Sequence, residues 1–164
     1  MRAAAKRWLP ARRRVPLAAA AVFLFVGCCV MRDVRWRPVR PPRGRQATVM
    51  RLETTGYCPC GQCCNWKRTW YGRPVIRSGP GRGRPKEVGM TASGRRARPG
   101  TIAADTDLFP FGTVMHVPGY GYGVVEDRGG AIRGRRIDLF FRRHQEALEW
   151  GRRTIEVRVW WPAR

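Results

Sequence analysis

The chain has 164 residues, of which 43% are hydrophobic, and 33 Lys and Arg residues against 11 Asp and Glu give a formal net charge of +22. This length leaves room for one domain with a modest core and excludes a large multidomain organisation. So basic a surface excludes cationic partners and favours polyanions, but charge alone does not distinguish nucleic acid from the anionic polymers of a cell envelope.

The N-terminus has the pattern of a secretory signal. A basic stretch from Arg2 to Arg14 runs into an apolar one from Leu17 to Val26, which is shorter than the roughly 20 residues of a transmembrane helix. Phe25-Val26-Gly27-Cys28 resembles the bacterial lipobox and predicts a lipid anchor on Cys28. An uncleaved signal anchor and plain secretion are the open alternatives. All three place the domain outside the cytoplasm. We expect it in the cell envelope, and Cys29 after Cys28 favours the outer membrane, facing the periplasm.

Along the chain we expect a leader at residues 1–27, an Arg- and Pro-rich tether at 28–47 and one folded domain at 48–164. Short β-type runs, most of them separated by Gly or Pro, cover Thr48–Thr55, Ile102–Ala104, Thr113–Val117, Gly121–Glu126, Arg136–Phe141 and Thr154–Val159. The stretch Arg142–Trp150 carries good helix formers, and Gly151 follows it as a helix C-cap. The connections are too short for helical crossovers, so the pattern predicts a mainly β, small closed barrel of six strands with one short helix.

Four cysteines fall within seven positions, at Cys58, Cys60, Cys63 and Cys64. Structural zinc sites usually draw their ligands as two separated pairs, whereas the two histidines, His116 and His144, lie far along the chain. In an oxidising envelope we therefore expect disulfides that join the first two cysteines to the last two, in either of two connectivities, and no metal. A metal site and free thiols are the alternatives. Both histidines are expected to be structural or solvated.

Three aspartates lie in well-defined settings. Asp105 follows a β-type run, Asp127 precedes a Gly-rich turn, and Asp138 stands between apolar residues on a predicted strand. Partial desolvation raises the pKa of a carboxyl group, which suits Asp138 to act as a general acid near neutral pH. The ordinary alternative is an aspartate that faces solvent or pairs with one of the many arginines.

Ordered motifs extend this pattern over about residues 54–159. They include Tyr57-Cys58-Pro59-Cys60, Thr91-Ala92-Ser93-Gly94, Gly100-Thr101-Ile102-Ala103-Ala104-Asp105, Phe109-Pro110-Phe111-Gly112-Thr113, Asp127-Arg128-Gly129-Gly130 and Ile137-Asp138-Leu139-Phe140. In this order they resemble the three-aspartate (3D) domain of bacterial cell-wall proteins, related to the catalytic core of membrane-bound lytic murein transglycosylase A. The resemblance implies a double-psi β-barrel that cleaves glycosidic bonds of peptidoglycan strands without a metal or other cofactor.

The resemblance also implies roles for the aspartates. Asp138 would protonate the glycosidic oxygen and then take the proton of the C6 hydroxyl, which closes onto C1 to give a 1,6-anhydro sugar. Asp127 would hold or polarise Asp138. For Asp105 two roles stay open, one in catalysis and one in orienting the loops of the barrel. Substrate contacts are expected from Thr91, Ser93, Gly129, Gly130 and the ring of Tyr120.

Three other functions compete with transglycosylation. Hydrolysis to a reducing end is the nearest, and a non-catalytic peptidoglycan-binding module belongs to a different class. A nucleic-acid-binding protein with a cysteine zinc knuckle is the third, and the predicted leader argues against it. We therefore expect peptidoglycan and, through the N-terminal anchor, a membrane as partners, and no nucleic acid.

Overall fold

The computed structural model describes residues 39–163. The predicted leader, the lipidation site Cys28 and the first part of the predicted tether lie outside the described residues. Within the described part, no helix is long and apolar enough to cross a membrane. The described residues all belong to one compact unit.

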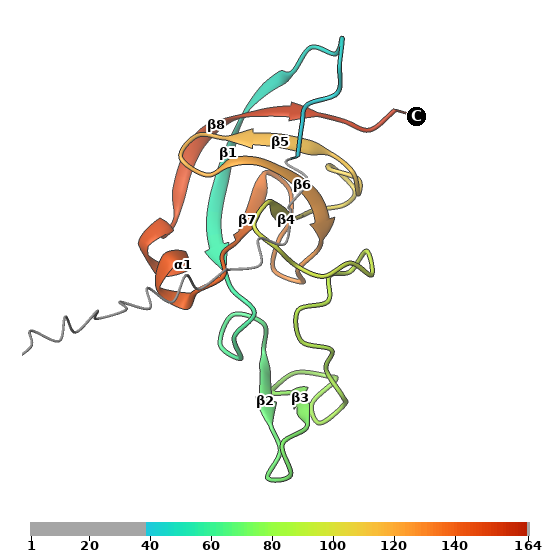
Figure 1. Cartoon of the computed structure of the whole chain (residues 1–164), viewed down its shortest axis with the longest axis vertical. Helices are drawn as coiled ribbons and strands as arrows, with labels where there is room; N and C mark the ends of the chain where they lie inside the picture. Colours follow the sequence, from blue (N-terminus) through green and yellow to red (C-terminus); the bar gives the residue numbers. More distant parts are fainter. Residues whose placement is uncertain (1–38, 164) are drawn as a thin grey trace, which may run out of the picture. The chain divides into compact units, whose positions relative to one another are not determined.

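Six strands close into a barrel in the order β1-β7-β4-β6-β5-β8 (Figure 1). Their bounds are Thr48–Tyr57 for β1, Thr101–Ala104 for β4, Val114–Val117 for β5, Gly121–Asp127 for β6, Arg136–Phe140 for β7 and Arg153–Trp160 for β8. The barrel closes because β1 pairs with β8 on one side, antiparallel, and with β7 on the other, parallel. A second parallel pair joins β4 to β6. The predicted mainly β fold with a six-stranded barrel is confirmed.

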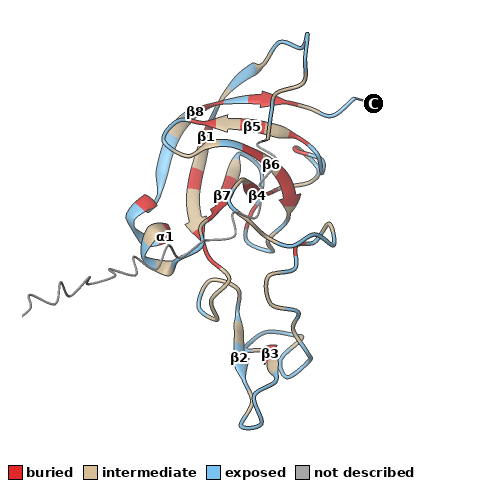
Figure 2. Ribbon diagram, in the orientation of Figure 1, coloured by how far each residue is buried: buried red, intermediate tan, exposed pale blue. Residues whose placement is uncertain are grey.

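The barrel interior is apolar, and every barrel strand contributes to it. Buried side chains recur at alternate positions, as on β5 and β8, because successive residues of a strand point to opposite faces (Figure 2). The resulting core comprises Leu52, Ile102, Met115, Val117, Val125, Ile137, Leu139, Val157 and Val159, all fully buried. Phe109, in the turn after β4, is also fully buried in this core.

The predicted short helix is α1, His144–Trp150. It ends where expected, because Gly151 has a positive φ of 65° and its N–H donates to the carbonyl of Ala147 at 3.2 Å. The indole of Trp150 donates to the buried Thr54 hydroxyl at 3.2 Å, which fastens the helix to β1. Gly56 permits this close packing, since a Cβ atom there would lie 2.9 Å from the Ala147 carbonyl oxygen.

The β1–β4 connection, residues 58–100, contains two strands that the sequence patterns did not predict. β2 (Trp66–Arg68) and β3 (Pro74–Ile76) form an antiparallel two-stranded sheet outside the barrel (Figure 1). Each has only three residues, and Lys67 and Arg68 of β2, together with Trp70 after it, face solvent. Strands this short show no alternating apolar pattern from which they could be recognised.

Candidate functional site

Two of the three aspartates meet on neighbouring strands of the barrel. Ala103 on β4 is the register partner of Asp127 on β6 and also of Asp138 on β7. Residues that stand side by side across a sheet point to the same face, so both carboxylates project from one surface with the small Ala103 between them. On the far side of β7, Thr55 of β1 is the partner of Asp138.

Asp138 lies in an environment that favours its protonated form. Burial is the main cause that raises its pKa to about 6, and the negative charge of Asp127 adds to the increase. A hydrogen bond from the Thr55 hydroxyl to Asp138 Oδ1, at 2.9 Å, acts in the opposite direction. The carboxyl group can therefore give up and regain a proton close to neutral pH, as the sequence analysis expects.

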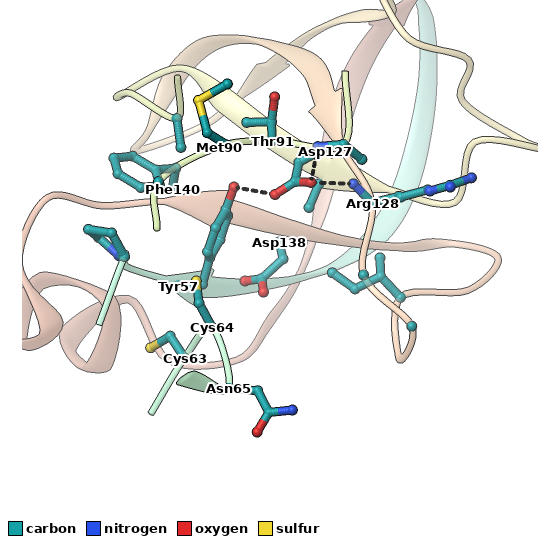
Figure 3. A pocket seen from close by; sticks show the side chains of 18 of the residues that line it. Tyr57, Cys63, Cys64, Asn65, Met90, Thr91, Asp127, Arg128, Asp138 and Phe140 are labelled. Atoms are coloured by element: carbon teal, nitrogen blue, oxygen red, sulfur yellow. Dashed lines mark hydrogen bonds between the residues drawn. The ribbon is translucent and has the colours of Figure 1, made fainter. Parts of the chain in front are cut away.

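Asp127 is instead held by several donors. Its Oδ1 atom accepts from the backbone N–H groups of Ala92 and Arg128, both at 2.9 Å, and its Oδ2 atom accepts from the Tyr57 hydroxyl at 3.3 Å. Figure 3 shows the Tyr57 hydroxyl directed at this carboxylate. Burial and the charge of Asp127 raise the pKa of Tyr57 above its usual range, so the phenol remains a donor. Asp127 is thus oriented from the barrel and from the β1–β4 connection.

Both aspartates line an open cavity of about 550 Å³. Its lining combines barrel residues, among them Ala103, with residues of the β1–β4 connection and of the loop between β6 and β7. Figure 3 shows Asp127 and Asp138 among these lining side chains. An apolar cluster of Tyr57, Ala103, Ile132 and Phe140 lines one part of the cavity. Carboxylates beside an apolar surface in a cavity of this size fit a small-molecule or oligomer binding site.

Asp105 does not join the other two aspartates. It is absent from the cavity lining, and its carboxylate accepts from the backbone N–H groups of Gly134 at 2.7 Å and Asp107 at 3.2 Å. These bonds lower its pKa, and Arg133 lies 3.9 Å away. Asp105 therefore connects the end of β4 to the β6–β7 loop, which favours the structural of the two predicted roles.

Three of the five predicted substrate contacts line the cavity, namely Thr91, Gly129 and Gly130. Gly130 faces open space, whereas a Cβ atom on Gly129 would lie 2.9 Å from Ile132. Ser93 is not in the lining, although its hydroxyl lies 3.1 Å from that of Thr91.

The prediction that the Tyr120 ring faces the substrate disagrees with the structure. This ring packs edge-on against Phe141 and Trp150. Its hydroxyl donates to the Phe140 carbonyl at 2.8 Å and accepts from the Gly100 N–H at 2.9 Å. Burial raises the pKa of Tyr120 to about 12. The residue belongs to the packing between α1 and the barrel because its hydroxyl finds two backbone partners there.

The cysteines also differ from the prediction. Cys58, Cys60, Cys63 and Cys64 are all free, and the Sγ atoms of Cys58 and Cys63 lie 3.7 Å apart, against roughly 2 Å in a disulfide. Three of the thiols surround the Nδ1 atom of His144, the histidine that the sequence analysis set aside. Cys64 is turned away and donates to the Cys58 carbonyl at 3.2 Å.

Sequence reasoning assigned no role to Thr55 or Tyr57, which contact the two aspartates. Tyr57 stands in a motif that carried the family resemblance, so its position was visible although its partner was not. Thr55 could have been found only from the parallel register of β1 and β7. Such a register follows from the tertiary fold rather than from either strand alone.

A small barrel with two carboxylates in an open cavity defines this site, and comparisons with known proteins agree with it. Residues 100–161 match the family model described as the 3D domain. The match contains Asp105, Asp127 and Asp138. The resemblance to three-aspartate proteins is thereby confirmed.

Two curated relatives are cell-wall proteins of Bacillus subtilis strain 168. The putative cell wall shaping protein YabE is 41% identical over 58 residues, which are 35% of this chain and 14% of YabE. The cell wall-binding protein YocH is 37% identical over 75 residues, which are 43% of this chain and 26% of YocH. The chain thus spans 14% of the length of YabE and 26% of the length of YocH.

Among solved structures, the chain is similar to the lytic transglycosylase MltA of Escherichia coli. One MltA structure has 23% identity and a TM-score of 0.38, with 49% of this chain and 30% of MltA covered. MltA with bound chitohexaose has 19% identity and a TM-score of 0.35, with 54% and 29% covered. A likeness at this level does not define an activity for the chain.

Proposed function

We propose that this protein cleaves glycosidic bonds of peptidoglycan strands, with Asp138 as the catalytic acid and base. The observation that carries the proposal is a carboxyl group with a pKa of about 6 in an open cavity that also holds a second, firmly oriented carboxylate. The 3D domain match and the cell-wall relatives support peptidoglycan as the polymer. The basic chain would be drawn to the carboxylates of this polymer.

The mechanism follows from one titrating group. Protonated Asp138 donates to the glycosidic oxygen as the bond from C1 to that oxygen breaks. The resulting Asp138 carboxylate then accepts the C6 hydroxyl proton while the C6 oxygen bonds to C1. The products are a free hydroxyl on one fragment and a 1,6-anhydro ring on the other, and no water is consumed. Three donors hold the Asp127 carboxylate in place. In this fixed position Asp127 orients the substrate or Asp138.

The decisive experiment is digestion of purified sacculi by the whole chain, with mass analysis of the fragments. We expect products lighter by one water than hydrolytic ones. Asp138→Asn keeps the size of the side chain but removes the proton transfer, so turnover should fall about 10²- to 10⁴-fold while sacculus binding persists. Asp107→Asn is the matched control, since this exposed aspartate lies outside the cavity. Fragments with reducing ends would show that the reaction is hydrolysis and not transglycosylation.

The second candidate is a peptidoglycan-binding module without turnover, favoured by the description of YocH as a cell wall-binding protein. It shares the fold and the cavity but needs no proton transfer. Sacculus binding without fragment release by the wild-type chain, across the pH range 4 to 8, would establish this alternative. Unchanged turnover in Asp138→Asn would instead mean that the protein is an enzyme in which Asp138 is not the catalytic group.

The location remains part of the proposal. An envelope protein that faces peptidoglycan agrees with the predicted leader and with the names of the relatives. Anchoring through Cys28 and residence in the outer membrane rest on the leader alone. Replacement of Cys28 by Ala, followed by fractionation, should release the domain from membranes if a lipid on this residue holds it.

A further inference from the structure

Beyond the carboxylate cavity, three thiols and one imidazole converge on a point beside the barrel. They are Cys58, Cys60 and Cys63, in the turn after β1, and His144, the first residue of α1. The three Sγ atoms and one ring nitrogen all lie within 4.8 Å of one another. Among residues 39–163, this is the group whose side-chain atoms are arranged to hold a metal ion.

The distances match those that a tetrahedral zinc ion imposes. With Zn–S near 2.3 Å and Zn–N near 2.0 Å, two sulfurs should lie about 3.8 Å apart, and a sulfur and a nitrogen about 3.5 Å apart. The Sγ atoms of Cys58 and Cys63 are 3.7 Å apart. His144 Nδ1 lies 3.7, 3.6 and 3.5 Å from the Sγ atoms of Cys58, Cys60 and Cys63. Four of the six distances among these atoms thus have the size that a tetrahedral zinc site requires, and the two remaining sulfur–sulfur distances are below 4.8 Å.

The local chain is folded as a metal-binding turn would be. Cys60-Gly61-Gln62-Cys63 has the two-residue spacing common in structural zinc sites, and the Cys63 N–H points at the Cys60 sulfur from 3.4 Å. Gly61 is required there, because a Cβ atom would fall 2.3 Å from the Trp66 carbonyl oxygen. Cys64 lies next to the cluster in sequence but donates its thiol to a backbone carbonyl instead.

The tertiary fold brings His144 to this turn. β1 and β7 run parallel and end together, with Tyr57 opposite Phe140, and the Phe141 N–H donates to the Tyr57 carbonyl at 2.7 Å. The chain leaves β1 into Cys58 and leaves β7 into α1, so the two ligand segments start side by side. A histidine 81 residues from Cys63 thereby becomes its neighbour.

We propose that Cys58, Cys60, Cys63 and His144 bind one structural Zn²⁺ ion, which fastens the β1–β4 connection to α1. Three thiolates and an imidazole in tetrahedral geometry are ligands that zinc prefers, and four protein ligands leave no open position for catalysis. Cys63 and Cys64 also line the carboxylate cavity, so the ion fixes one wall of that cavity. The proposal does not depend on what the cavity binds.

The test is metal content of the purified whole chain, supplied with Zn²⁺ alone under reducing conditions. We expect about one zinc per chain. Replacement by Co²⁺ should give the visible bands of a tetrahedral site and a sulfur-to-cobalt charge-transfer band in the near ultraviolet. Absence of bound zinc, or cobalt spectra without the charge-transfer band, would overturn the proposal.

Variants locate the ion. Cys60→Ser and His144→Ala should lose it, whereas the matched controls Cys64→Ser and His116→Ala should keep it, because neither residue belongs to the cluster. If His144→Ala does not fold, His144→Cys still decides, since a fourth thiolate should retain cobalt and strengthen the charge-transfer band. Equal metal content in the wild type and Cys60→Ser would contradict the assignment.

Thiol mapping separates zinc from disulfides. In the unreduced, denatured protein, alkylation should label Cys58, Cys60 and Cys63 once a chelator is present. In the native zinc-loaded protein the same residues should be protected, and Cys64 provides the comparison within the same peptide. A disulfide in the native protein that joins Cys58 or Cys60 to Cys63 or Cys64 would overturn the proposal and restore the pairing expected from sequence.

Discussion

The barrel and the β1–β4 connection differ in what holds them together. Each barrel strand places at least one side chain in a common apolar core, whereas the connection, over residues 58–100, buries only Cys58, Val75 and Thr91. Burial of apolar area stabilises the barrel, and hydrogen bonds, turns and the proposed zinc ion stabilise the connection. The carboxylate cavity lies between the two, so the barrel supplies its aspartates and the connection supplies part of its wall.

The largest effect should come from the core. Leu52→Ala removes a fully buried side chain and should lower the free energy of unfolding by about 2–5 kcal/mol. Val75→Ala removes the buried side chain of β3, which belongs to neither apolar cluster, and should cost about 1 kcal/mol. Urea unfolding followed by tryptophan fluorescence measures both. Equal losses would mean that the connection depends on apolar burial as strongly as the barrel does.

A smaller effect, of opposite sign, should come from Asp138 at the boundary of the two regions. Its folded pKa of about 6 lies above the unfolded value of about 3.8, so ionisation costs stability. This cost is absent below pH 3.8, grows between pH 3.8 and 6, and is complete above pH 6. Asp138→Asn should therefore stabilise the protein at pH 8 by about 1–3 kcal/mol and leave it unchanged at pH 3.5.

Unfolding of Asp138→Asn at several pH values distinguishes this origin from ordinary repacking. A gain that is the same at pH 3.5 and pH 8 would show that the carboxylate charge is not its cause. Asp107→Asn should change stability at neither pH, because Asp107 is exposed. If Asp138→Asn instead lowered the free energy of unfolding at pH 8, burial would not be destabilising the Asp138 carboxylate.

The smallest effect should come from the barrel side of the site. Thr55→Val removes the hydroxyl that donates to Asp138, so the pKa of Asp138 should rise further, by less than about one unit. The carbon-13 shift of the Asp138 carboxyl, followed against pH, measures this without any need for activity. Thr154→Val, an exposed change on β8, is the control. A pKa that falls would contradict the hydrogen bond between Thr55 and the charged carboxylate.

The sequence by itself determined most of the barrel and its carboxylates. Short β-type runs, most of them bounded by Gly or Pro, located all six barrel strands to within one or two residues, and Gly151 marked the end of the helix, because these signals depend on local residue preference and backbone conformation. Asp138, between apolar neighbours on a strand, was recognisable as a desolvated acid for the same reason. The short β2 and β3 strands carried no such period and were missed.

The tertiary structure alone decided which of these residues meet. The registers of β4, β6 and β7 bring Asp127 and Asp138 to either side of Ala103 and leave Asp105 at a loop. Packing of α1 on β1 turns Tyr120 into the interior, away from the cavity. The parallel pairing of β1 with β7 places His144 beside the cysteines, although the two segments lie far apart in the sequence. Local patterns fix what a strand is, but partners distant in the chain depend on how the strands pair, and pairing is a property of the whole barrel.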